Sequence, residues 1–183
     1  NNLITLNLLT AGTYSDCKIK VTDNLSNESN NLIISEFIID STAPSLLEVT
    51  AIATPTNDNT PDYTFSSSEV GTITYGGPCS SGTTSAASGN NTVTLNTLND
   101  GTYSSCTISV RDNSSNTSVT LNISSFIVDT TSPTVISTSG VDNSSTNTTS
   151  VSATFSELID NLTITSTTFK ITDASNNSVS GNL

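Results

Sequence analysis

Residues 1–45, NNLITLNLLTAGTYSDCKIKVTDNLSNESNNLIISEFIIDSTAPS, recur without a gap at residues 90–134 as NNTVTLNTLNDGTYSSCTISVRDNSSNTSVTLNISSFIVDTTSPT. Identical residues occupy 26 of the 45 aligned positions, at a constant offset of 89 residues. A repeat with a fixed period is typical of proteins built from similar units in tandem. The repeat therefore predicts a modular chain whose working property is reach rather than chemistry.

The residue pattern within one period indicates strands and turns. Thr, Val, Ile, Tyr and Phe dominate the patterned segments, and Asn, Gly, Asp and Pro separate them. We expect an all-β chain with strands over 46–53, 62–68, 70–75, 91–98, 102–112 and 118–129, and a loop or weak edge strand over 80–90. The inward parity changes between Ile123 and Phe126, which predicts a bulge or kink there. Short strands at this spacing favour a β-sandwich.

The repeat divides the chain into three parts. We expect residues 1–43 to be the C-terminal part of one repeat, residues 44–132 a complete repeat, and residues 133–183 the N-terminal part of a third, divergent domain. Val151–Glu157 (VSATFSE) aligns with Tyr63–Glu69 (YTFSSSE), but Asn161–Leu183 departs from the repeat. Because the first copy begins within the period, we expect the sequence to be a piece of a longer, processed polypeptide.

Composition excludes several functional classes. The formal net charge is −12, from 16 acidic against 4 basic residues, which disfavours binding to nucleic acids and to anionic membranes. No apolar run is long enough for direct membrane insertion. The chain has no His, so neither a Ser-His-Asp nor a Cys-His arrangement can form. Its paired carboxylates lie in turns, where such groups are usually solvated, and we expect that the protein is not an enzyme.

The three cysteines follow the repeat. Cys17 and Cys106 are equivalent, and the equivalent of Cys79 would fall eleven residues before Asn1. One disulfide per repeat, Cys79–Cys106, therefore accounts for all three, with Cys17 paired to a residue outside the sequence. Such a disulfide predicts an extracellular or cell-surface location. The alternative is unpaired, buried cysteines in a cytosolic protein; a zinc site is disfavoured because His and Cys-x-x-Cys are absent.

Several segments resemble bacterial immunoglobulin-like (Big-type) tandem repeats, which form the stalks of large surface adhesins. DGTYSSCTISVRDNSSN and FIVDTTSPT resemble the common repeat, and VSATFSELID with TFKITDASNNSVSG resembles the subtype of S-layer-associated proteins. The resemblance covers essentially the whole chain and implies tandem immunoglobulin-like β-sandwich domains. Tyr103 is similar to the tyrosine of a tyrosine corner, although it lies three residues before Cys106 and not two.

In such a sandwich the last strand leaves beside two of the loops, so acidic residues would gather at the junctions between domains. Carboxylates from separate loops suit Ca²⁺, which would stiffen the linker. The alternative is solvated turn aspartates. At the first junction we expect Asp40 to meet Glu69 and Asp112. At the second we expect Asp58, Asp62, Asp100 and Asp129, with Glu157 from the next domain.

Three functions are compatible with this sequence. The first is a non-enzymatic extracellular spacer in a cell-surface adhesin or fibre, whose partners are neighbouring repeats and whose distal ligand the sequence does not specify. The second is a subunit of a self-assembling filament, joined by strand donation between chains. The third is a carbohydrate-binding module, which is disfavoured because residues 44–132 contain only five aromatic residues.

Overall fold

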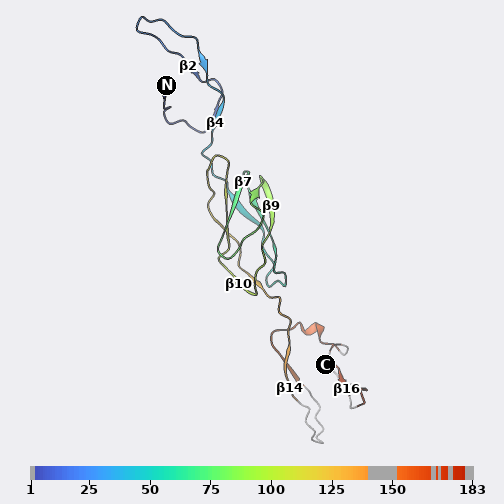
Figure 1. Cartoon of the computed structure of the whole chain (residues 1–183). Helices are drawn as coiled ribbons and strands as arrows, with labels where there is room; N and C mark the ends of the chain where they lie inside the picture. The colour runs from blue at the N-terminus through green and yellow to red at the C-terminus, as the bar shows by residue number, and fades with distance from the viewer. Residues whose placement is uncertain (1–2, 140–151, 166–167, 169, 173–174, 180–183) are drawn as a thin grey trace. The chain divides into compact units, whose positions relative to one another are not determined.

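The computed structural model describes residues 3–139, 152–165, 168, 170–172 and 175–179 (Figure 1). The all-β prediction is confirmed, because the described residues form seventeen strands and one 3-10 turn but no α-helix. The chain divides into two compact units, Asn1–Thr130 and Thr131–Leu183, and each is described by itself.

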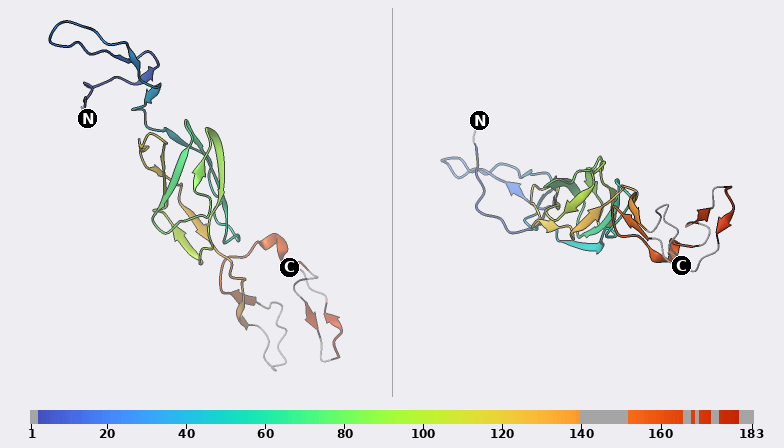
Figure 2. Two further views of the ribbon diagram at one scale, coloured as in Figure 1. Left: turned by 45° about the horizontal axis from the view of Figure 1, so that its top comes forward. Right: turned by 90° about the horizontal axis from the view of Figure 1, so that it is seen from below.

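The complete repeat contains three antiparallel sheets, whose strands run from cyan through green to orange in Figure 2. The first sheet has the order β5 (Leu46–Thr50), β6 (Asp62–Ser67) and β9 (Gly89–Thr94). The second has the order β12 (Leu121–Asn122), β11 (Thr107–Arg111), β7 (Gly71–Gly76) and β8 (Ser85–Ala86). The third pairs β10 (Gly101–Tyr103) with β13 (Phe126–Val128).

One hydrophobic core joins the two larger sheets. Tyr63 and Phe65 of β6 are fully buried, as are Ile108 and Val110 of β11, and all four belong to the same core cluster. The alternation along both strands follows the predicted period of two, which places every second side chain on the inner face. Two sheets that contribute to one core are consistent with a β-sandwich.

The two longest predicted strands are each interrupted. Residues 102–112 form β10 and β11, and residues 118–129 form β12 and β13. The break in the second confirms the predicted kink. The break between β10 and β11 was not predicted, and it has the same cause, a change in which residues face inward. Tyr103 stacks on Phe126 with ring centroids 5.2 Å apart, and Cys106 is buried, so inward residues are three positions apart instead of two.

Residues 3–43 reproduce the strand pairings of the second half of the repeat. β1 (Gly12–Tyr14) pairs with β4 (Phe37–Ile39), and β2 (Lys18–Ile19) pairs with β3 (Leu32–Ile33). Every register in these pairs recurs in β10–β13 and β11–β12 with 89 added to both numbers. The sequence repeat is therefore also a repeat of local structure.

The described residues of the second unit form two small pairs of strands. β14 (Val135–Ser139) pairs with β15 (Ser152–Phe155), and β16 (Ile171–Thr172) pairs with β17 (Ser178–Val179). A 3-10 turn at Asn161–Thr163 begins where Asp160 accepts a hydrogen bond from the N–H of Leu162. Val151, the first residue of the VSATFSE segment, lies outside the described residues.

Candidate functional site

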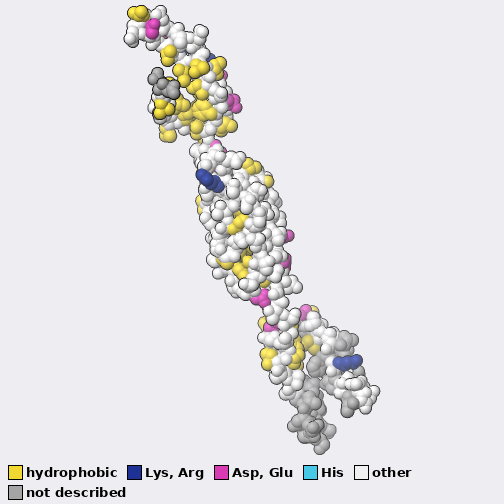
Figure 3. Space-filling view, in the orientation of Figure 1, with side chains coloured by type: hydrophobic (Ala, Val, Ile, Leu, Met, Phe, Trp, Pro, Cys, Tyr) yellow, Lys and Arg dark blue, Asp and Glu magenta, His cyan; other side chains and the backbone are white. Residues whose placement is uncertain are grey.

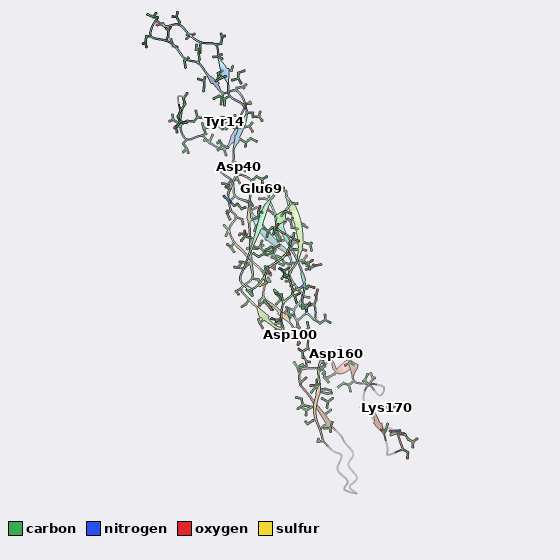
Figure 4. All side chains as sticks on the ribbon, viewed as in Figure 1. Tyr14, Asp40, Glu69, Asp100, Asp160 and Lys170 are labelled. Atoms are coloured by element: carbon green, nitrogen blue, oxygen red, sulfur yellow. A yellow bond between two sulfur atoms is a disulfide. The ribbon has the colours of Figure 1, made fainter. Side chains whose placement is uncertain are left out.

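Three carboxylates from separate connections meet at one end of the complete repeat. Asp40 follows β4, Glu69 lies between β6 and β7, and Asp112 follows β11. One carboxylate oxygen from each lies within 4.8 Å of the others. Figure 4 shows Asp40 and Glu69 close together, at the opposite end of the repeat from Asp100. The structure therefore brings together the three residues expected at the first junction, and we call them the acidic cluster.

Asn116 fixes Asp112 in a tight loop. Oδ1 of Asp112 accepts a hydrogen bond from the backbone N–H of Asn116 at 2.8 Å, and Oδ2 accepts one from its side-chain amide at 2.8 Å. Ser115 has a φ of 77°, and its N–H donates to the carbonyl of Asp112. Asp23 and Asn27 form the same loop in the first copy. The Asp-x-x-x-Asn spacing therefore sets the direction of this carboxylate in both copies.

Local hydrogen bonds also hold the other two members of the cluster. Oδ1 of Asp40 accepts a hydrogen bond from the N–H of Thr42 at 2.9 Å. The side-chain amide of Asn116 donates to the carbonyl of Asp40 at 3.2 Å, so the end of β4 is bonded to the loop after β11. The hydroxyl of Ser67 donates to the carbonyl of Glu69 at 2.7 Å. These bonds fix the backbone from which the acidic side chains project.

The carboxylates influence the protonation of one another. Burial and the negative charges of Asp40 and Asp112 raise the pKa of Glu69 above its ordinary value. Burial also opposes ionisation of Asp112, but the hydrogen bonds from Asn116 outweigh it and lower the pKa of Asp112. An added cation would offset the two negative charges that oppose ionisation of Glu69.

The spacing of the cluster is compatible with one calcium ion. Ca²⁺ takes oxygen ligands at about 2.3–2.6 Å, so two oxygens on one ion lie at most about 5 Å apart. The carboxylate oxygens of Asp40, Glu69 and Asp112 meet this limit. Acidic side chains often approach one another on protein surfaces without an ion, so calcium at this position stays a prediction.

The carboxylates expected at the second junction have separate partners. Asp58 accepts hydrogen bonds from the N–H and hydroxyl of Thr60, and Asp62 accepts one from the hydroxyl of Thr94 at 2.6 Å. Within the described residues, the group of carboxylates with metal-ligand spacing is the acidic cluster, and it includes none of those expected at the second junction.

Asp100 and Asp129 of this second set lie at the end of β13. Asp100 accepts hydrogen bonds from the N–H and hydroxyl of Thr130, at 2.9 and 2.7 Å, and the N–H of Asp129 donates to the carbonyl of Thr56. Glu157 belongs to the other compact unit. Calcium at the second junction stays a prediction from the sequence.

The structure contains the predicted disulfide between Cys79 and Cys106, whose Cα atoms are 5.3 Å apart. Cys17 is a free, half-buried thiol. Gly77 has a φ of +70°, and a Cβ atom at this position would collide with the carbonyl of Ser105. The chain can therefore bring Cys79 beside Cys106 only because residue 77 has no side chain. A disulfide is typical of a protein in a non-reducing compartment.

Two side-chain contacts in the structure were not predicted from the sequence. Glu48 of β5 binds Ser124 across 76 positions of sequence, and no local pattern indicates such a pair. The hydroxyl of Tyr103 donates to the carbonyl of Asn99 at 2.8 Å, and the equivalent Tyr14 donates to Thr10 at 2.9 Å. A tyrosine bonded to the backbone a few residues upstream matches the tyrosine-corner contact, so the resemblance could have found this bond despite the different spacing.

A depression of about 780 Å³ lies beside the start of β6 and the end of β9. Its lining residues are Thr60, Ser81, Gly82, Thr83, Thr94, Leu95, Asn96 and Thr97, and they include no aromatic side chain.

Within the described residues, no helix has the length and apolar character needed to cross a membrane. No protein-family model matches the chain, and no curated protein matches it.

Proposed function

We propose that these residues are non-enzymatic, extracellular spacer repeats of a cell-surface adhesin or fibre of the bacterial immunoglobulin-like class, and that they hold a binding domain away from the surface. The observation that carries the proposal is the recurrence of strand registers at an offset of 89 residues. A structural unit that is copied with its pairings intact adds length with each copy.

The linkers support this role. Asp40–Pro44 and Asp129–Pro133 connect the repeats, and each ends in a proline that restricts both itself and the residue before it. The hydrogen bond from Asn116 to the carbonyl of Asp40 adds a fixed contact between the first linker and the complete repeat. Limited bending at the linkers would convert repeat number into reach.

Small-angle X-ray scattering tests the proposal on chains with one, two and three copies of residues 44–132. We expect the maximum dimension to increase by a constant step of about 30 Å or more per copy, which is the diameter of a compact domain of this size. A radius of gyration that grows as in a compact globule would contradict the spacer role.

Calcium at the acidic cluster is part of this proposal. Asp40 belongs to the linker, whereas Glu69 and Asp112 belong to loops of the complete repeat. An ion bound by all three would reduce motion of the linker against the repeat. Binding is expected to raise the melting temperature of the chain in CaCl₂ relative to EGTA.

Two other functions remain as alternatives. A self-assembling filament, joined by donated strands, would appear as a ladder of short subunits in mass spectrometry of the native protein, whereas a stalk would be one long polypeptide. A carbohydrate-binding module usually needs an aromatic platform, and the depression beside β9 has none in its lining. Binding on a glycan array would favour that third function.

A further inference from the structure

Residues 3–39 expose a face whose counterpart in the complete repeat is buried core. Ile4, Leu6 and Val21 are 57%, 52% and 64% exposed. Their equivalents 89 residues later, Val93, Leu95 and Val110, are at most 1% exposed. Figure 3 shows hydrophobic side chains gathered on this N-terminal part of the chain. We call this surface the open face.

The local structure behind the open face is already formed. Ile34 N–H donates to the carbonyl of Cys17 as Ile123 N–H donates to that of Cys106, both at 2.9 Å. Tyr14 stacks on Phe37 with ring centroids 5.3 Å apart, close to the 5.2 Å of the equivalent pair. The open face is therefore half of a core whose local pairings are in place, and it lacks a covering layer.

The strands that are short or missing identify that layer. β9 is six residues long because it pairs with β6, whereas residues 3–5, the described equivalents of its second half, form no strand. β11 has five residues and pairs with β7, whereas β2, its equivalent, has two residues and lacks such a partner within the described residues. Both deficits correspond to partners within residues 45–89. The covering layer must therefore supply counterparts of β6 and β7.

We infer that the open face binds a segment with the chemistry of residues 45–89, located on the N-terminal side of Asn1 in the same polypeptide. That segment carries two aromatic residues placed as Tyr63 and Phe65 and a cysteine placed as Cys79. The thiols of this cysteine and Cys17 form a disulfide by exchange with a disulfide-bearing oxidant, which takes up the two electrons and two protons and leaves as two thiols. The inference is independent of the spacer role, since it concerns how the first repeat is completed.

Burial and tethering favour this occupant over a second copy of the chain. In a second copy, residues 45–89 already cover that copy's own core, so an exchange would expose as much apolar surface as it buries. A segment tethered to Asn1 has an effective concentration in the millimolar range and displaces nothing. In the complete repeat, β9 continues without a break from residue 89 into residue 90. A segment joined directly to Asn1 would reproduce this continuity in the first repeat.

The test uses the whole chain extended by a copy of its own residues 45–89, fused directly before Asn1. In the unextended chain we expect one free thiol, Cys17. In the extended chain we expect none, a mapped disulfide between Cys17 and the added copy of Cys79, and at least tenfold slower amide hydrogen exchange in residues 3–9 and 18–21.

A matched control carries Tyr63→Asn and Phe65→Asn in the added copy alone, and it keeps the added cysteine. We expect this control to retain fast exchange over residues 3–9, because its inserted strand has no apolar side chains for the open face. Equal exchange rates in the extended chain and the unextended chain would overturn the inference. So would equal protection in the extended chain and its control, or a bond from the added cysteine to Cys106.

Discussion

Glu48 accepts two hydrogen bonds from Ser124, one from the backbone N–H at 2.9 Å and one from the hydroxyl at 2.6 Å. The pair joins β5, the first strand of the complete repeat, to the break between its last two strands, β12 and β13. Burial opposes ionisation of Glu48, but the two bonds from Ser124 outweigh it and lower the pKa of Glu48. Burial and the charge of Glu48 raise the pKa of Tyr63 beneath it.

Glu48→Ala is expected to destabilise the complete repeat by about 1 kcal/mol, since two charge-assisted hydrogen bonds are lost at a largely solvated site. Urea denaturation at pH 7 measures the change. The control is Glu36→Ala, which removes an exposed carboxylate from the first copy and should leave the stability unchanged. An equal loss in both variants would show that the Ser124 contact contributes nothing.

Acid should weaken the same contact. The pKa of Glu48 is lower in the folded chain than its ordinary value of 4.5, so the contact contributes full stability above about pH 4.5 and loses it as the pH falls through the folded pKa. Asp112 behaves in the same sense from its ordinary value of 3.8. Urea midpoints measured from pH 6 to pH 3 should therefore fall below pH 4.5, and the fall should be smaller in Glu48→Gln.

Removal of the disulfide should be the most damaging change. A loop of about 28 residues closed by Cys79–Cys106 is expected to stabilise the repeat by about 3.6 kcal/mol on the chain-entropy account. The double variant Cys79→Ser with Cys106→Ser tests this by urea denaturation without leaving a new thiol. Cys17→Ser is the matched control and should retain the wild-type midpoint. A loss below about 1 kcal/mol in the double variant would contradict the expectation.

Gly77→Ala should destabilise the repeat by at least about 1–2 kcal/mol, because φ at this position is +70° and the new methyl group meets the carbonyl of Ser105. Thermal unfolding measures the effect. Gly82→Ala is the control, since a Cβ atom there has nothing within 4 Å. Similar melting temperatures for the two variants would show that the turn before Cys79 tolerates a side chain.

The substitution Glu69→Gln tests the acidic cluster, because it is expected to change the melting temperature in opposite directions without and with calcium. The pKa of Glu69 is raised in the folded chain. The contribution of this side chain to folding stability is therefore fully present below about pH 4.5, its ordinary pKa, and is lost as the pH rises through the folded pKa. At pH 7 in EGTA, the variant should therefore melt slightly above the wild type, because it removes a charge that the charges of Asp40 and Asp112 oppose. In CaCl₂ the order should reverse, because the variant has lost a ligand.

The control for calcium is Asp58→Asn, which lies outside the acidic cluster and should retain the wild-type response to calcium. Differential scanning calorimetry in CaCl₂ and in EGTA gives both comparisons. Identical melting temperatures for the wild type in the two buffers would remove calcium from the proposed function, and the spacer role would still stand on the repeat.

Much of the fold was predictable because strand period and turn residues are local signals. Tyr63 and Phe65 are two residues apart in the predicted strand 62–68 and therefore share one face, and both are fully buried. The acidic cluster was predictable in part, because the repeat placed Asp40 at the end of a domain beside the loops of the next. In the second set of carboxylates, hydroxyl groups of Thr60, Thr94 and Thr130 bind Asp58, Asp62 and Asp100 individually. Such partners depend on side-chain positions that no spacing rule gives.

The sequence by itself determined the 89-residue period, the all-β class and the pairing of Cys79 with Cys106, because each follows from residue spacing along the chain. Tertiary structure decided the break between β10 and β11, the bond between Glu48 and Ser124, and the exposure of Ile4 and Val21. These depend on contacts between segments that are distant in sequence. A strand ends where its partner ends, and an apolar face is buried only where another layer covers it.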